Sequence, residues 1–429
     1  MWHLTAFTST QVIDSMSLVM EIDVADKAAN QVAEEILDRG ESTAMMDPVR
    51  LAEDSRFRPE LLELAFDLVG KAAGFRRSLP PAVSSSLADL VRSMNCYYSN
   101  LIEGHNTHPI DIERALKGAF SNNAKKRNLQ LEAKAHIEVQ RWIDGGGLRG
   151  RATTTTGLRE IHRRFCSELP DELLWVEDPE THARLPVIPG EFRSTLVAVG
   201  RHVSISPGAV PRFMDRFEDV YSKLNKVETV LAAAAAHHRL VWIHPFLDGN
   251  GRVARLMSHA TLLETLDTGA IWSVARGLAR DETAYKELLA NCDQTRRNDR
   301  DGRGNLSEEA LAEFARFFLK TCIDQVNFME SLVRPENLRA RVHKWVEDES
   351  LNPKAGVLLD ATLYRGEVPR GEVASLLGVS PRLGRNIVAD LAKHEVLTSD
   401  TPYGSLRVVF PARLASRWMP DLFPPEPQQ

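Results

Sequence analysis

Two helical patterns separated by a short glycine-containing turn constrain the fold of this chain most. Residues 228–241 contain five consecutive alanines, and the high helix propensity of alanine predicts a helix there. The turn that follows contains Gly249 and Gly251, and a second helical pattern covers residues 251–266. The turn therefore opens onto the start of a helix, where unpaired backbone N–H groups favour an anion.

Helical patterns of this kind dominate the 429 residues, so we predict a mainly α fold. The length fits about two or three domains. We predict a helical N-terminal region over 1–83, a helical core over 84–328, a separate C-terminal domain over 329–420 and a disordered tail over 421–429.

Apolar spacing predicts the remaining helices of the N-terminal region and the core. They cover residues 25–37, 59–72, 84–103, 131–143, 156–169, 210–224, 281–291 and 307–326. Leu79-Pro80-Pro81 is predicted to be a break between segments, with Ser84 to Ser86 capping the helix that follows. Gly104 is predicted to end that helix.

The C-terminal domain has the pattern of a winged helix. A helix over 339–346 precedes two helices, 370–377 and 381–394, and strand-like runs follow at 396–398 and 406–409. Four arginines bracket the two-helix unit, but four acidic residues dilute their charge. Target recruitment or dimerisation, including a homodimer, therefore fits this domain better than DNA binding, which stays an alternative.

Charge, hydropathy and cysteines limit the compartment and the partners. The net charge of −6 predicts no general attraction to nucleic acid. No apolar run reaches the roughly 20 residues of a membrane helix, and the N-terminus lacks the pattern of a secretory signal. The cysteines have no C-x-x-C spacing and are predicted to be buried thiols in a reducing cytoplasm. They are Cys96, Cys166, Cys292 and Cys322.

The turn between the two central helices carries the densest chemistry. His244 is a natural general base because its side chain titrates near neutrality. Asp248 is a lone carboxylate of the kind that holds Mg²⁺ beside phosphate oxygens. Arg252 and Arg255 lie three apart on one helical face and suit the same phosphate chain, and Asn250 offers an amide to a phosphate oxygen. Gly249 and Gly251 allow the backbone to approach a phosphate closely.

The string from His244 to Arg255, HPFLDGNGRVAR, resembles the signature of Fic-domain proteins. The resemblance covers roughly residues 84–326 and implies a compact helical fold that transfers AMP from ATP to Ser, Thr or Tyr hydroxyls. It also implies His244 as the base, Asp248 as the Mg²⁺ ligand, and Asn250 to Arg252 as the cradle of the phosphates.

Residues 185–207 are rich in β-branched residues, glycine and proline and predict a short hairpin. The hairpin is similar to the flap with which Fic proteins bind an extended target segment by strand addition. The flap residues expected to bind the target are Gly190, Phe192, Arg193, Val197 and Val199.

Ser99 and Glu103 end the helix predicted over 84–104 and are similar to the inhibitory motif of the family. In such proteins the glutamate pairs with the second arginine of the loop, here Arg255, and prevents ATP from binding in a pose suited to in-line attack. Downstream, Tyr285 and Asn291 lie in the region where the family contacts adenine and ribose, but Tyr285 fits a core position equally well.

We therefore expect a self-inhibited protein adenylyltransferase that uses ATP and Mg²⁺ and modifies a protein target and itself. A DNA-binding regulator that senses ATP is one alternative. An enzyme that uses another nucleotide, or that removes AMP from modified proteins, is the other.

Overall fold

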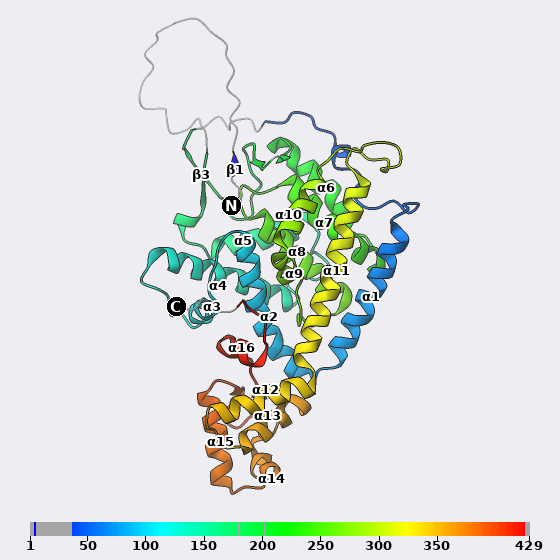
Figure 1. Cartoon of the computed structure of the whole chain (residues 1–429). Coiled ribbons are helices and arrows are strands. Elements are labelled where there is room, and N and C mark those ends of the chain that lie inside the picture. Colours follow the sequence, from blue (N-terminus) through cyan, green and yellow to red (C-terminus); the bar gives the residue numbers. More distant parts are fainter. Residues whose placement is uncertain (1–3, 6–36, 179–180, 201, 425–429) are drawn as a thin grey trace, which may run out of the picture.

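The computed structural model describes residues 4–5, 37–178, 181–200 and 202–424. This part of the chain is mainly helical, which confirms the predicted fold class (Figure 1). The helix predicted over 25–37 falls almost wholly outside the described residues. The helices of the core are α1 (Arg58–Arg77), α2 (Pro81–Ile102), α3 (Pro109–Leu116), α4 (Ala124–Asp144), α5 (Thr155–Ser167), α6 (Val210–Tyr221), α7 (Lys226–Ile243), α8 (Asn250–Leu266), α9 (Val274–Arg280), α10 (Glu282–Asn291) and α11 (Glu308–Val333).

Helices α7 and α8 confirm the two helices predicted on either side of the turn, and both are largely buried in the core. The Asn225 side chain caps α7 by accepting a hydrogen bond of 3.0 Å from the Glu228 backbone N–H. Residues 232–236 are all buried alanines, and their small side chains let α7 pack closely against α8. The chain then turns through His244 and Gly249, both with positive φ, before α8 begins.

Helix α2 begins earlier than predicted, because Pro81 occupies its first turn. Proline suits this position since its missing N–H would be unpaired there in any case. Ser84 to Ser86 therefore lie inside the helix, and the prediction that they cap it is wrong. The C-terminal end is as predicted: Gly104 has φ +83°, and the His105 N–H donates back to the Asn100 carbonyl at 2.9 Å.

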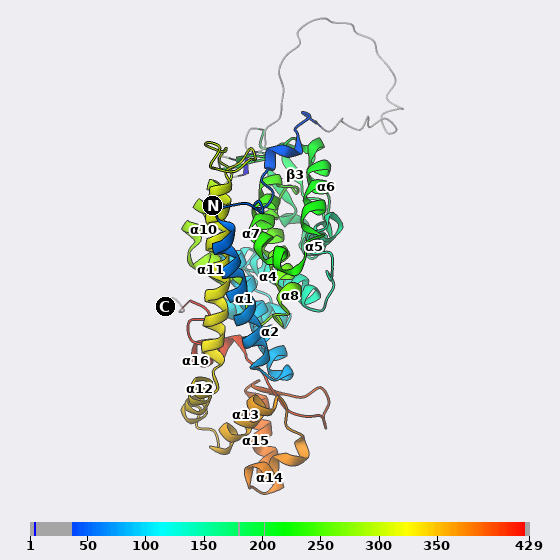
Figure 2. The ribbon, with the colours of Figure 1, turned by 90° about the vertical axis from the view of Figure 1, so that its right-hand side faces the viewer.

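The N-terminal region and the core are not separated at residue 83. Helix α1 packs along α11, and the two lie side by side in both views of the ribbon (Figures 1 and 2). Helix α11 also continues past the predicted boundary at 328 to Val333. The hydrophobic residues of α1 complete the core that α11 and α7 begin.

The strands are short, and the hairpin predicted over 185–207 is divided. Strand β3 (Arg184–Pro186) pairs with β2 (Trp175–Glu177), whereas β4 (Ala198–Val199) pairs with β5 (His202–Val203). Pro189 and the positive φ of Gly190 interrupt the strand geometry between these pairs. The opposite edge of β4 pairs with β1 (Leu4–Thr5), so that Leu4 lies opposite Val199.

The C-terminal domain contains the predicted helices and strands in the predicted order, together with one helix, α13, that was not predicted (Figure 2, lower part). They are α12 (Pro335–Asp348), α13 (Lys354–Arg365), α14 (Val373–Leu377), α15 (Pro381–Lys393), β6 (Leu397–Thr398) and β7 (Arg407–Val408). Strands β6 and β7 pair antiparallel, with Leu397 opposite Val408.

After β7 the chain returns toward the core through α16 (Ala415–Trp418). The prediction of a disordered tail from residue 421 is wrong for residues 421–424, because Leu422 is fully buried and Phe423 packs against the core. An apolar contact thus fixes a segment that looked polar and proline-rich.

All four cysteines are buried and unpaired, as predicted. Within the described residues, no helix combines the length and the apolar character that a membrane crossing requires.

Candidate active site

The turn between α7 and α8 places backbone donors at the start of α8. The first intrahelical bond of α8 runs from the Val253 N–H to the Gly249 carbonyl at 3.0 Å. The N–H groups of residues 250–252 precede that bond and have no carbonyl partner within the helix. Gly249 has φ +79°, a left-handed conformation that suits glycine and turns the chain into α8.

Asn250 holds the turn closed through its side chain. Its Oδ1 accepts from the Phe246 N–H at 3.0 Å, and its Nδ2 donates to the Phe246 carbonyl at 2.8 Å. The amide predicted to face a phosphate is therefore engaged within the turn. What Asn250 offers to an anion is its backbone N–H.

His244 ends α7 in a left-handed conformation and is buried. Its Nδ1 lies 3.3 Å from the Val241 carbonyl, which can only accept, so the ring proton is on Nδ1 and Nε2 has a free lone pair. Burial, followed by the charge of Arg193, lowers the pKa of His244 to about 3. The imidazole is thus neutral near physiological pH, as a general base requires.

Arg193 was predicted to contact a target, but its side chain is buried and bonds the backbone around His244. Its buried guanidinium donates to the carbonyls of His244 at 2.7 Å, Ile205 at 2.6 Å and Thr195 at 2.8 Å. Its backbone N–H also donates to the Pro245 carbonyl at 2.9 Å. These bonds fix the backbone around His244 in its left-handed conformation.

His162 on α5 also supports the turn, although this residue was not predicted from the sequence. Its ring stacks on Phe246 with centroids 4.0 Å apart, and its Nδ1 accepts from the Gly190 N–H at 2.8 Å. Burial lowers the pKa of His162 to about 4, so the ring is neutral. Gly190 therefore joins the flap segment to the turn.

Asp248 is half-buried, and within the described part of the chain no hydrogen bond or ion pair engages its carboxylate. The described residues hold no group of three or more His, Cys, Asp or Glu side chains that could bind a metal by protein ligands alone. One carboxylate together with phosphate oxygens is the usual ligand set of Mg²⁺. The residues present therefore fit an ion that arrives with a nucleotide.

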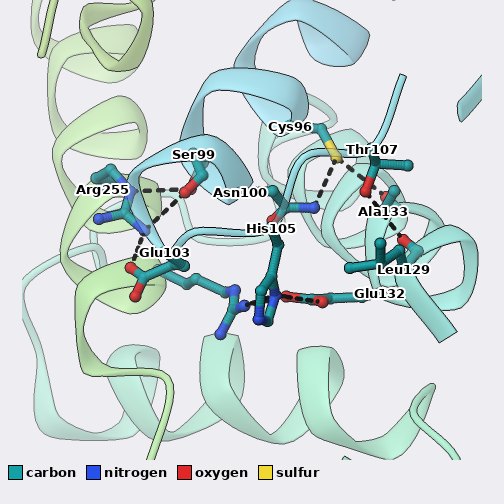
Figure 3. A network of polar contacts seen from close by, with 11 residues as sticks. Cys96, Ser99, Asn100, Glu103, His105, Thr107, Leu129, Glu132, Ala133 and Arg255 are labelled. Carbon is teal, nitrogen blue, oxygen red and sulfur yellow. Dashed lines mark hydrogen bonds and ion pairs between the residues drawn. The ribbon is translucent and has the colours of Figure 1, made fainter. Parts of the chain in front are cut away.

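Glu103 at the end of α2 pairs with Arg255 on α8, as the resemblance implies, and Ser99 contacts the same arginine (Figure 3). Arg255 Nε donates to Ser99 Oγ at 2.8 Å, and its Nη2 donates to the Ser99 carbonyl at 3.2 Å and pairs with Glu103 Oε1. A Cβ on Gly251 would lie only 2.6 Å from Glu103 Oε1. The carboxylate thus sits against the start of α8, in the place that favours an anion.

The Glu103 carboxylate is charged despite its surroundings. Burial alone would raise its pKa, but Arg255 and then Arg252 outweigh burial and lower the pKa to about 2. The carboxylate is therefore ionised throughout the physiological pH range.

Arg252 pairs with a second carboxylate, Glu132 on α4, which was not predicted from the sequence. The two side chains form a buried ion pair, and His105 Nδ1 lies 2.8 Å from Glu132 Oε2 and 3.1 Å from Arg252 Nη2. Figure 3 shows His105 and Glu132 beside the end of α2. The Arg252 guanidinium lies over the Phe165 ring at 5.3 Å, and its Nε has no partner among the described residues.

Opposing effects act on this second pair as well. Burial would raise the pKa of Glu132, but Arg252 and His105 lower it. The hydrogen bond with Glu132 raises the pKa of His105. The sequence did contain a pattern that could have indicated Glu132. Glu132, His136 and Gln140 are polar residues spaced four apart on α4, and all three are buried.

The two residues predicted to contact adenine and ribose differ in their surroundings. Tyr285 is buried and bonds His237 Nε2 through its hydroxyl at 2.8 Å, which favours its interpretation as a core tyrosine. Asn291 Oδ1 accepts from the side chain of Gln294 at 2.9 Å.

Of the remaining flap residues, Val197 is buried, and Phe192 is half-buried against Phe246 with ring centroids 5.9 Å apart. Their side chains thus contact the core. Val199 lies in β4, the strand whose outer edge is paired with β1.

Comparison with known proteins agrees with this geometry. Residues 152–262, which include the whole turn, match the model of the Fic/DOC family. A protein adenylyltransferase Fic of Nematostella vectensis is 30% identical over 240 residues, covering 54% of this chain and 52% of the relative. A protein of the same name from Drosophila grimshawi is 30% identical over 169 residues, covering 39% of this chain and 32% of the relative.

The chain thus spans about half, or less, of the length of the curated relatives it matches. Among solved structures, a Fic family protein from Desulfovibrio desulfuricans G20 aligns with a TM-score of 0.48 at 17% identity, covering 84% of this chain and 98% of that one.

Proposed function

We propose that the Fic domain of this chain transfers AMP from ATP to a Ser, Thr or Tyr hydroxyl of a protein target, and that Glu103 inhibits the transfer. One observation carries the proposal: the Glu103 carboxylate lies against Gly251 at the start of α8, paired with Arg255, where a phosphate of ATP would bind. An anion of the protein itself thus occupies the anion site.

The turn supplies the groups that a triphosphate requires. The N–H groups of residues 250–252, at the start of α8, have no partner within the helix and can donate to a phosphate. The Arg252 Nε is a buried donor without a partner among the described residues. Asp248 would hold Mg²⁺, which screens the phosphate charge when it is bound.

His244 would accept the proton of the target hydroxyl at Nε2. The hydroxyl oxygen then forms a bond to the α-phosphorus of ATP, the bond from that phosphorus to the bridging oxygen breaks, and pyrophosphate leaves. The neutral ring and the Nδ1 contact with Val241 fit this role. The names of the curated relatives, protein adenylyltransferase Fic, support AMP as the group transferred.

The target would lie in an extended conformation beside β4, bonded through its main chain. The pairing of β1 with that edge supports the edge as a place for an added strand.

The test measures transfer of label to protein from α-labelled ATP with Mg²⁺, for wild type, Glu103→Gly and the double variant Glu103→Gly/His244→Ala. We expect Glu103→Gly to label at least about tenfold faster than wild type, and the double variant to lose about 100-fold or more of that rate. Equal labelling by wild type and Glu103→Gly would refute the inhibition, and full labelling by the double variant would refute the base.

Parallel reactions with α-labelled UTP and GTP test the nucleotide. Faster transfer from either one would replace ATP in the proposal, whereas release of label from previously modified protein would indicate removal of AMP.

A further inference from the structure

The segment after the C-terminal domain folds back onto the helix that carries the inhibitory motif. We call residues 415–424 the C-terminal strap. At its start, the buried Trp418 packs edge-on against Trp345 of α12 and against Phe410, with ring centroids 5.3 and 6.2 Å apart. Figure 1 shows α16, in red, next to α12, with which it is in contact. The strap is therefore anchored in the C-terminal domain.

The other end of the strap is bonded to α2 and to its neighbour α9. The Tyr98 hydroxyl donates to the Leu422 carbonyl at 3.1 Å, and the Tyr97 ring packs against Phe423 with centroids 5.8 Å apart. Arg276 of α9 donates to the Asp421 carbonyl at 2.7 Å. Leu422 itself is fully buried, so this end of the strap is part of the core.

These contacts lie next to the inhibitory motif along α2. Tyr97 and Tyr98 directly precede Ser99, whose hydroxyl and carbonyl bind Arg255, and Glu103 follows one helical turn later. The hydrogen bonds of an α-helix make these residues move together, so a restraint on Tyr98 also restrains Ser99.

The C-terminal domain also contacts the chain on the other side of the motif. Lys117, at the end of α3, pairs with Glu395 at 2.8 Å, and Glu113 of α3 accepts from the Arg413 N–H at 3.3 Å. The inhibitory segment 99–105 thus lies between two places where the C-terminal region is attached.

We propose that the C-terminal strap holds α2 in its inhibitory position, so that release of the strap activates the transferase. The proposal rests on the function proposed above and adds its regulation: a ligand or partner that pulls the strap from α2 would weaken the contact of Glu103 with Arg255. While the strap is bound, it restrains α2, and α2 in turn holds Glu103 against Arg255.

The test uses the full chain with Leu422→Asp, which places a charge in the apolar site of the strap, and Ser416→Asp, which adds the same charge at an exposed position of the strap. Tyr98→Phe removes the hydroxyl that donates to the Leu422 carbonyl and that also contacts Arg276, and keeps the aromatic ring. Label transfer from α-labelled ATP is measured with Glu103 intact and in the Glu103→Gly background. Hydrogen exchange is followed in residues 419–424 and 99–105.

With Glu103 intact, we expect Leu422→Asp to label about five- to tenfold faster than wild type, Tyr98→Phe to increase labelling less, and Ser416→Asp to leave it unchanged. In the Glu103→Gly background, none of the three should increase labelling. Exchange should rise in both 419–424 and 99–105 for Leu422→Asp.

Faster exchange in 419–424 without a change in 99–105 or in labelling would overturn the role of the strap. Loss of the proposed function has a different signature: Glu103→Gly itself would not label protein. Exchange in 99–105 would still report whether the strap restrains α2 in that case.

Discussion

The two arginines of the turn each face a carboxylate, but the two carboxylates differ in how they are held. Glu132 lies in the middle of α4 with its side chain 6% exposed, and Arg252 is 7% exposed. Glu103 lies just past the last residue of α2 with its side chain 27% exposed, while Arg255 is 2% exposed. One pair is thus closed to water on both sides, and the other is open on the side of the carboxylate.

This difference indicates two separate tasks for two similar ion pairs. A carboxylate fixed in a helix interior sets the direction of Arg252 and leaves its Nε unpartnered among the described residues. A carboxylate at a helix end can move away when the end of the helix moves, which frees Arg255. Glu132 would therefore position one arginine, and Glu103 would release the other.

The largest expected difference between the pairs is in stability. Glu132→Ala leaves Arg252 buried without its counter-charge, so we expect a loss of about 3–5 kcal/mol in the free energy of unfolding. Glu103→Ala lets water reach Arg255 from the exposed side, and we expect a loss of about 1 kcal/mol. Chemical unfolding curves measure both, and similar losses for the two variants would end the distinction.

A second difference should be seen in activity. Glu103→Gln keeps the size of the side chain but removes the charge that holds Arg255, so label transfer from ATP should rise about tenfold, or roughly 1.4 kcal/mol. Glu132→Gln should not raise the rate of label transfer, because its partner Arg252 is the arginine proposed to bind the phosphates. An increase with Glu132→Gln would make Glu132 a second inhibitory residue.

A smaller effect is expected from Ser99, the neutral contact of Arg255. Ser99→Ala removes the hydrogen bond of 2.8 Å to Arg255 Nε, and one such bond is worth about 1 kcal/mol, or roughly fivefold in rate. We expect about this increase in label transfer with Glu103 intact. In the Glu103→Gly background, adding Ser99→Ala should leave the rate of label transfer unchanged.

The smallest effect concerns pH. The bond with Glu132 raises the pKa of His105 above its ordinary value of 6.5, so its stabilisation is complete below that value and is lost as pH rises through the raised pKa. Because the pKa of Glu103 is about 2, we expect no change in the charge of the Glu103–Arg255 pair over the same pH range. The stability difference between wild type and His105→Gln, below about 1 kcal/mol because the ring is half exposed, should therefore shrink from about pH 6 to about pH 9. Thermal unfolding at several pH values measures it.

The residues of the turn were predictable because their chemistry is local. Asp248, Gly249 and Gly251 follow one another between two strongly patterned helices, and the structure keeps them together at the start of α8. Ser99 and Glu103 were found only through the resemblance to Fic proteins, since a serine and a glutamate four apart have no chemistry of their own.

The supporting residues could not be predicted in the same way. Arg193 and Val197 were assigned to the target, yet burial places both in the core, because apolar spacing in a short irregular segment does not reveal which side faces inward. Gly190 was likewise predicted to bind the target as part of the flap, but its N–H donates to His162 of α5.

The sequence by itself determined the helical class, the α7–turn–α8 unit and the chemical groups of the turn, because these depend on propensity and on neighbours within a few residues. Only the tertiary structure decided which carboxylate meets which arginine and what restrains α2. Glu132 and Arg252 are 120 positions apart, and Tyr98 and Leu422 are 324 apart. Contacts over such separations depend on how whole helices pack, and no local pattern in the chain encodes that packing.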